Sequence, residues 1–446
     1  MRAALGIGRV CLAGWSVPSG SSSSGFVCLQ SWRGLKAKAV RDEDPSRIPP
    51  PWPYRDVGYN RYWWALDYTK KRLTESSKLI VVEGNVGSGK SSLARELAKE
   101  LDFFFIPQRT LDHILINRYG TDHRDFYHLM PQSCQLPDFN MYYENPRNPK
   151  VARMQEHLFY MKFEAFQNAI AHILNTGQGV VLERSPHSDF VFVNAMRQKG
   201  FVSHQYLRCY YYSRKIMLPE LYFWPHLVIY LDVPVHECME RIKKRGIPSE
   251  NNGKVIDYEY LDTIHQSYKD FLREVDPHSY TLCYDWSTPG TVDQVIEDIE
   301  KLDLDFFEWH AGIRLQSWGK LKDGIDWNKW RHQHTTKEYG HVLWYDIGLL
   351  KYECEEIHIS PADWHQYVCV LKKFVYGPYA PGYSREKGDS WWRMFWRPPG
   401  FFHVTTTGSW YEHFYKDVWY MLLSDDYYTW DDKYGDKLYE PDYGSH

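Results

Sequence analysis

Short apolar runs alternate with stretches of helical periodicity through the middle of the chain. The apolar runs are rich in β-branched and aromatic residues, which is typical of buried strands. The predicted strands are Lys78–Glu83, Phe103–Ile106, Gly179–Leu182, His226–Leu231 and Ser279–Tyr284. Between them, apolar residues recur every three or four positions, which predicts helices with one buried face. These helices are expected at Lys90–Leu101, Gln155–Asn175, Val235–Arg245, Tyr258–Val275 and Thr291–Leu302.

Strands that alternate with helices predict an α/β fold, a doubly wound parallel sheet covered on both faces. The alternation begins at Lys78 and stops after Leu304, so we expect one domain at residues 78–304. Residues 42–77 before it are rich first in Pro and then in Tyr and Trp, which predicts an irregular N-terminal arm. Residues 305–446 hold 12 of the 19 Trp and few helical patterns, so we expect a long, irregular, Trp- and Tyr-rich C-terminal extension.

Three interpretations of this aromatic C-terminal extension are open. It can form a small domain with its own Trp-rich core, or it can pack on the α/β domain. It can also present a protein-contact surface, because aromatic residues and Arg are enriched in the cores of interfaces. The last two interpretations are of similar weight and are compatible with each other. A solvated, unfolded extension is disfavoured because so many aromatic side chains would associate in water.

The N-terminal residues 1–41 carry six Arg or Lys and no acidic residue, and Ser is frequent. This composition is typical of a mitochondrial transit peptide. A secretory signal is the competing interpretation, but the apolar run Val10–Trp15 is short and contains Gly14. Removing residues 1–41 takes away six positive charges and changes the net charge from −4 to about −10. A negative net charge argues against a nucleic-acid polymer as the main partner.

The remaining chain offers little for metal or redox chemistry. The eight cysteines form no CxxC pair and no zinc-type spacing with His, so we expect reduced thiols. Neither an iron–sulfur cysteine cluster nor a Gly-x-Gly-x-x-Gly dinucleotide motif is present. No run approaches the ~20 apolar residues of a membrane span, so no transmembrane segment is expected. The following residues are interpreted as solvated surface: His332, His334, His341, Asp425, Asp426, Asp431 and Asp432.

A phosphate-binding motif joins the first predicted strand to the first predicted helix. Residues 84–91 match G-x-x-x-x-G-K-[ST], in which backbone N–H groups surround a phosphate. Lys90 is expected to reach the β- and γ-phosphates, and the Ser91 hydroxyl is expected to bind Mg²⁺. The candidate phosphate-binding residues are Gly84, Asn85, Val86, Gly87, Ser88, Gly89, Lys90, Ser91 and Ser92.

Four motifs in order over residues 78–302 resemble the deoxynucleoside kinase family. They are the loop Gly84–Ser91, Tyr142–Pro146 followed by Met154-Gln155, Leu182–Ser185, and Glu240–Arg245. The resemblance implies a P-loop kinase fold in which Gln155 holds the nucleoside base. It also implies that Glu183 and Arg184 lie beside Mg²⁺ and the 5′-hydroxyl, with Glu183 a candidate metal ligand. The basic segment Arg241–Arg245 would be a lid over the phosphates, with Arg241 and Arg245 as its candidate residues.

The catalytic set of the family is incomplete in this sequence. The family places its general base, a glutamate, in a Glu-Pro-Val motif after the second strand, where this chain has Ile106 before Pro107. Gln108 has no acidic group to act as a base, and Ile247 stands where the family's lid has a second arginine. Losing a positioned base costs about 10²–10⁴ in rate. The sequence therefore predicts a retained binding fold with no catalytic residues, or Glu183 and Arg184 in that role if the chain is active.

The transit peptide, the kinase-like domain and the aromatic extension together resemble the deoxynucleoside-kinase-like accessory subunits of mitochondrial complex I, NADH:ubiquinone oxidoreductase. The resemblance implies a non-catalytic subunit, peripheral to the matrix face of the inner membrane, with other subunits of the complex as partners. It implies no cofactor for catalysis and a site for a purine nucleotide (ATP, ADP or a deoxynucleotide) with Mg²⁺. The alternative is an active mitochondrial deoxynucleoside kinase that transfers the ATP γ-phosphate to a nucleoside 5′-hydroxyl.

Overall fold

The computed structural model covers the α/β domain almost completely and parts of both ends of the chain. It describes residues 35–38, 48–54, 59, 72–116, 121–251, 253–304, 314–319, 321, 324–336 and 354–371. Most of the predicted transit peptide and arm lie outside these residues, as do His341 and the whole of residues 372–446.

Five parallel strands form one sheet in the order β2-β3-β1-β4-β5. They are β1 (Leu79–Gly84), β2 (Phe104–Ile106), β3 (Val180–Glu183), β4 (Leu227–Asp232) and β5 (Tyr280–Asp285). All five predicted strands are confirmed, each displaced by about one residue. Every residue of β1 and β3 is buried, which is why the apolar residues before Glu83 and Glu183 follow one another without alternation. The order places β1, which leads into the phosphate-binding loop, at the centre of the sheet.

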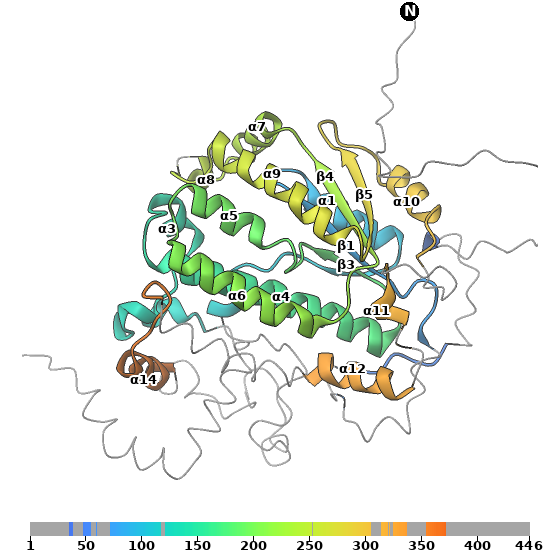
Figure 1. Cartoon of the computed structure of the whole chain (residues 1–446), viewed down its shortest axis with the longest axis horizontal. Helices are drawn as coiled ribbons and strands as arrows, with labels where there is room; N and C mark the ends of the chain where they lie inside the picture. Colours follow the sequence, from blue (N-terminus) through green and yellow to red (C-terminus); the bar gives the residue numbers. More distant parts are fainter. Residues whose placement is uncertain are drawn as a thin grey trace, which may run out of the picture.

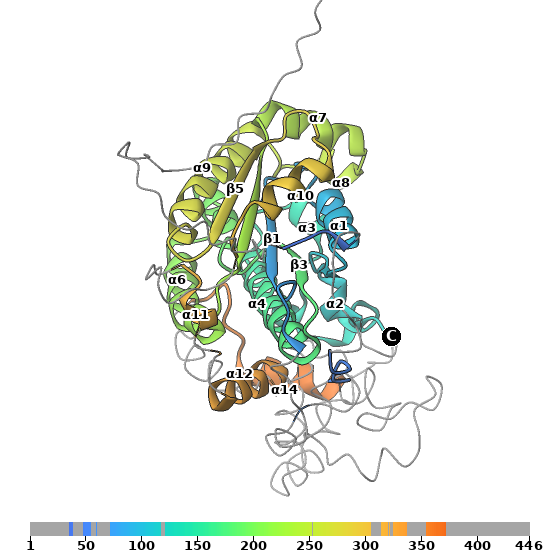
Figure 2. The same ribbon diagram turned by 90° about the vertical axis from the view of Figure 1, so that its right-hand side faces the viewer.

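Helices cover both faces of this sheet, as the doubly wound class requires (Figures 1 and 2). On one side lie α1 (Lys90–Glu100) and α10 (Val292–Glu300). On the other lie α4 (Lys150–Thr176), α5 (Phe190–Gln198), α6 (His204–Leu221) and α9 (Tyr258–Val275). The remaining short elements of the domain are α2 (Asp112–Leu115), η5 (His123–Leu129), η6 (Gln132–Cys134), α3 (Phe139–Glu144), α7 (Val235–Arg245) and α8 (Pro248–Asn251).

The long helix α4 is buried along almost its whole length, polar residues included. It begins before the predicted start at Gln155, at Lys150, whose N–H donates to the Asn148 side chain at 3.0 Å. The helices α5 and α6 were not predicted, because their apolar residues do not form a clean 3.6-residue pattern. No helix within the described residues is apolar over a length that could cross a membrane.

The described parts of the C-terminal extension pack on the α/β domain. They form α11 (Gln316–Gly319), α12 (Gly324–Thr336) and α14 (Pro361–Val370). The Trp318 indole N–H donates to the Trp224 carbonyl at 2.7 Å, and α12 lies against α4. The Ser133 hydroxyl donates to Asp363 of α14 at 2.7 Å. Intramolecular packing is therefore the correct interpretation for these parts of the extension.

The interpretation of His332 and His334 as solvated surface was wrong. Both side chains are buried, and His334 is 0% exposed. Their i, i+2 spacing resembles a strand or loop, but the segment is helical, and α12 turns Trp327, Arg331 and His334 into the protein interior. Burial lowers the pKa of His334 to about 3, so this imidazole is neutral at physiological pH.

Candidate functional site

The phosphate-binding loop runs from the end of β1 to the start of α1. Gly87 and Gly89 have φ angles of 80° and 89°, a left-handed conformation that L side chains rarely adopt. Asn85 is buried, and its amide donates to the Leu261 carbonyl at 3.0 Å while its oxygen accepts the Val86 N–H at 2.8 Å. The loop is thus held in place by α9 and presents the N-terminus of α1, where a phosphate is stabilised by N–H groups and the helix dipole.

Lys90 and Ser91 of this loop meet Glu183 from the end of β3. The Ser91 hydroxyl donates to Glu183 Oε1 at 2.6 Å, and Lys90 Nζ lies 3.9 Å from the same oxygen. Burial, and next the charge of Arg184, lower the pKa of Lys90 to about 7. A hydroxyl beside a carboxylate is an oxygen donor set of the kind that Mg²⁺ prefers. These residues are compatible with a magnesium-bound phosphate at the carboxyl ends of β1 and β3.

The segment after β3 is fixed by a buried carboxylate from β1. Glu83 is fully buried and accepts the Ser185 N–H at 2.8 Å, the Ser188 hydroxyl at 2.6 Å and the Tyr268 hydroxyl at 3.2 Å. Arg184, directly before Ser185 in the chain, has a φ of 65° and a buried guanidinium 4.3 Å from the centre of the Phe192 ring. Glu83 therefore orients the turn that carries Glu183 and Arg184.

Gln155 belongs to a buried polar cluster that the sequence did not reveal. Its amide donates to Asp189 at 3.1 Å, and the same carboxylate accepts the Tyr210 hydroxyl at 2.8 Å and pairs with Lys162. Lys162 follows Gln155 by two helical turns, so both project from one side of α4. Asp189 is 0% exposed and satisfies three donors. The signal that could have found this cluster is the single lysine two turns after Gln155 on an otherwise apolar helix face.

The two candidate lid arginines are bound to protein groups. The Arg241 guanidinium donates to the backbone carbonyls of Ser88, Trp286 and Ser287, at 3.2, 2.8 and 2.6 Å. It therefore connects α7 to the phosphate-binding loop. Arg245 at the end of α7 pairs with Glu250 of α8 at 2.6 Å. The geometry thus gives Arg241 a structural contact in addition to its place beside the loop.

The position of the family's general base lies at the end of β2. Ile106 is buried in the core of the domain. The Gln108 N–H, two residues on, faces Glu183 Oε2 at 3.4 Å. Arg109 pairs at 2.5 Å with Glu164, which is 1% exposed and belongs to α4. The residues after β2 therefore place the Gln108 N–H near Glu183. The side chain of Arg109, the next residue, pairs with Glu164 instead.

Within the described residues, no metal-binding cluster lies beyond this site. The part of the chain that the structure describes contains no group of three or more His, Cys, Asp or Glu side chains arranged to hold a metal ion. Six cysteines are described and none forms a disulfide with another.

Comparison with known proteins agrees with this geometry. Residues 80–320, more than half of the chain, match the family model for deoxynucleoside kinase. The chain therefore belongs to the deoxynucleoside kinase family. At a finer level it belongs to the family of a mitochondrial NADH dehydrogenase subunit, to which it is 33% identical.

This relative is NADH dehydrogenase (ubiquinone) 1 alpha subcomplex subunit 10, mitochondrial, of Mus musculus. It is 33% identical over 328 residues, which cover 73% of this chain and 86% of the relative. Deoxyguanosine kinase of Dictyostelium discoideum is 27% identical over 232 residues, covering 52% of this chain and 72% of that enzyme. Among solved structures, deoxyadenosine kinase from M. mycoides with bound dATP is similar at 19% identity and a TM-score of 0.38. That similarity covers 50% of this chain and 98% of the enzyme.

Proposed function

We propose that the chain is a non-catalytic accessory subunit of mitochondrial respiratory complex I, the NADH dehydrogenase of the inner membrane. Its place is the matrix side of the membrane arm, peripheral to the membrane, where contacts with other subunits attach it and support assembly or stability. The observation that carries the proposal is the similarity to the mouse subunit, which spans 86% of that protein. This similarity is longer than the match to deoxyguanosine kinase, which covers 52% of this chain.

The N-terminal segment supports import into mitochondria. Its basic, acid-free composition is that of a transit peptide. Leu35 is only 2% exposed and packs in the core of the domain, and the Ala37 N–H donates to Glu300 at 3.0 Å. These contacts favour cleavage before Leu35 over cleavage at residue 41, because the mature domain would otherwise lose them.

The phosphate-binding loop in this proposal retains a purine nucleotide. Residues 84–92 would hold its phosphates, Lys90 would supply a positive charge, and Ser91 with Glu183 would hold Mg²⁺. The metal would neutralise phosphate charge when bound. Gln155 would face the base from its position on α4. A nucleotide held in this way stabilises the folded chain without being consumed.

The residues at the end of β2 and after α7 support the proposal that the chain is not an efficient enzyme. Ile106 occupies the position of the expected base, and Glu183 is engaged by Ser91 and Lys90. Ile247 stands in place of the second lid arginine. With these groups absent, proton removal from a 5′-hydroxyl has no dedicated acceptor.

The second candidate function is an active mitochondrial deoxynucleoside kinase. The intact phosphate-binding loop and the buried cluster at Gln155 favour it, because a kinase needs both a phosphate site and polar groups that recognise a base. In this case Glu183 would act as the base and Arg184 would stabilise the transferring phosphoryl group.

Native electrophoresis of mitochondrial membranes tests the accessory function. We expect the chain to co-migrate with the complete dehydrogenase. Only free monomer in matrix extracts would overturn the proposal. Purified chain assayed with deoxynucleosides and ATP separates the two candidates, because turnover at ordinary kinase rates that Lys90→Ala abolishes would establish the kinase instead.

The pKa of Lys90 predicts how nucleotide affinity depends on pH. Below about pH 7 the amine is already protonated in the free protein and presents its charge to phosphate. Above about pH 7, binding must take up a proton, so affinity should fall by up to tenfold per pH unit. Calorimetric titration between about pH 6 and about pH 9 measures this slope. Lys90→Arg stays charged and should give a flatter profile, whereas an unchanged wild-type affinity over this range contradicts the assignment.

A further inference from the structure

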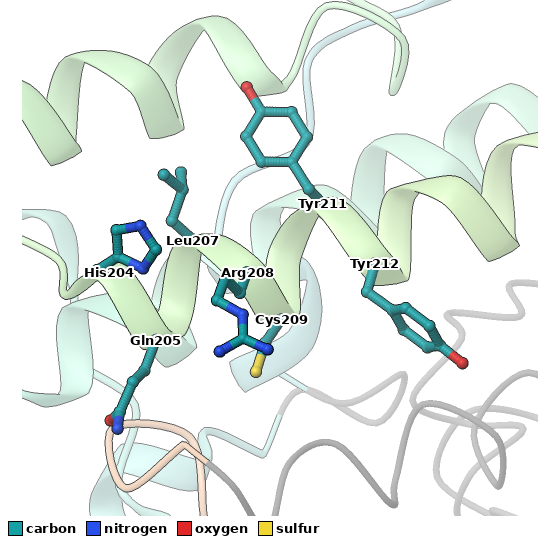
Figure 3. A pocket seen from close by; sticks show the side chains of 7 residues that line it. All are labelled: His204, Gln205, Leu207, Arg208, Cys209, Tyr211 and Tyr212. Carbon is teal, nitrogen blue, oxygen red and sulfur yellow. The ribbon is translucent and has the colours of Figure 1, made fainter.

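Exposed side chains follow one side of α6. Between positions 204 and 215 they recur at helical spacing, and they are His204, Gln205, Arg208, Tyr211, Tyr212 and Lys215. We call these six residues the α6 face. Residues of α6 between His204 and Tyr212 also line a cavity of about 520 Å³. Figure 3 shows Tyr211 and Tyr212 extending from the helix at the two edges of this face. The α6 face therefore combines aromatic rings with a hollow.

The cations of the α6 face have no acidic partner within the described residues. The helix contains no Asp or Glu before Glu220. Arg208 and Lys215 are both exposed and form no ion pair with any residue that the structure describes. By contrast, Arg214, which turns toward α9, pairs with Glu274 at 2.7 Å. The α6 face thus carries positive charge that no neighbouring carboxylate of the described domain balances.

The two tyrosines favour a protein as the partner of this face. Their side chains are 38% and 45% exposed. The Tyr211 hydroxyl donates to Asn194 of α5 at 2.8 Å, which fixes the ring before binding and lowers the entropy cost of association. Tyr and Arg are the residue types that dominate binding energy in protein interfaces. The six residues include no aliphatic side chain and no Trp that could insert into lipid, so a membrane surface is the poorer match.

We propose that the α6 face docks an acidic segment of a neighbouring protein. This inference rests on the proposed function, in which that protein is another subunit of the dehydrogenase. Arg208 and Lys215 are separated by two helical turns, about 10 Å at ~1.5 Å per residue. The docked segment carries two carboxylates at this separation, as at positions i and i+7 of a helix, and an apolar side chain between them that enters the cavity. The paired charges fix its register on α6.

A zero-length cross-link identifies the partner of the α6 face. Carbodiimide couples the Lys215 amine to a carboxylate only when the two are in contact, and the full chain needs no substitution for this reaction. We expect the assembled dehydrogenase to yield a product between Lys215 and an Asp or Glu of another subunit, mapped by mass spectrometry. Arg208→Lys keeps the charge and should add a second product within the same partner segment. Lys99, exposed on α1 at the other face of the sheet, is the matched control and should not couple to that segment.

Three other results would overturn the inference. Coupling of Lys215 within one chain to residues 425–432 would identify the chain's own acidic C-terminal residues as the occupant. Coupling between isotopically light and heavy chains would identify a second copy. Binding to vesicles of phosphatidylcholine with phosphatidylserine that Arg208→Glu abolishes, without any protein product, would identify an anionic lipid surface.

Charge reversal measures how much the α6 face contributes to attachment. Arg208→Glu combined with Lys215→Glu should lower the fraction of the chain that co-migrates with the dehydrogenase about tenfold, because the carboxylates of the partner would then face like charges. Arg95→Glu combined with Lys99→Glu makes the same change in charge on exposed residues of α1 and should co-migrate as the wild type does. Thermal unfolding of both double variants verifies that they keep the fold.

The failure of this inference is distinguishable from the failure of the proposed function. Equal co-migration of the wild type and the α6 double variant would overturn the inference and leave the accessory function intact. A wild-type chain that stays outside the complex would overturn both. The cross-link from Lys215 uses the wild-type chain, so its result decides the inference even where the double variant is unstable.

Discussion

Lys90→Ala is expected to weaken nucleotide binding by about 100-fold, on the order of 2.8 kcal/mol. Lys90 is the buried cation of the phosphate-binding loop, and its amine lies 3.9 Å from Glu183 at the point where phosphate would enter. A charge-assisted contact in a desolvated site is stronger than one in water, so its removal has a large effect. Titration with ATP, ADP and deoxynucleotides in the presence of Mg²⁺ measures the change.

The stability of the nucleotide-free variant distinguishes lost binding from lost folding. The folded-state pKa of Lys90 is lowered, so its protonated form is less favourable in the folded protein than in the unfolded chain. Below about pH 7 the folded protein carries this full penalty, and Lys90→Ala removes it. The variant should therefore unfold at the same or a higher denaturant concentration. Lys99→Ala on the same helix should bind nucleotide as the wild type does, and equal binding by Lys90→Ala would contradict the site.

The central part of the fold could be predicted because its signals are local. Each strand is a continuous apolar run, and β1 is followed at once by the glycines that the loop requires. The loop residues and Glu183 come together because parallel strands end at the same edge of the sheet. The fold class and the place of the candidate phosphate-binding loop in the fold were therefore accessible from the sequence alone.

The burial of residues that contact distant parts of the chain could not be predicted from local sequence patterns. His334 is buried because Trp330 stacks on it, and Trp330 in turn stacks on Tyr222 from the far end of α6. Arg331 is 0% exposed, lies 3.8 Å from the centre of the Tyr59 ring and donates to Asn175. A helix face made of Trp, Arg and His does not register as apolar, so periodicity alone does not identify it.

Asp189 is the other residue that the sequence did not mark, and its removal should have the largest effect on stability. Asp189→Ala is expected to lower the free energy of unfolding by about 3–5 kcal/mol, the usual cost of breaking a buried ion pair. The variant leaves Lys162 charged in a buried site and removes the acceptor of Gln155 and Tyr210. Burial already lowers the pKa of Lys162, and Asp189 opposes this shift more strongly than Glu83 does. Urea-induced unfolding measures the loss.

A second substitution tests whether the unpaired cation is the cause. Lys162→Met in the Asp189→Ala background removes the buried charge while keeping the length of the side chain, so it should restore a large part of the lost stability. Asp270→Ala removes the partner of an exposed pair with Arg273, whose side chains are 63% and 80% exposed, and should change stability little. A double variant as unstable as Asp189→Ala would mean that the hydrogen bonds to Gln155 and Tyr210 carry the effect. Wild-type stability in Asp189→Ala would show that the cluster does not hold α4 to α5 and α6.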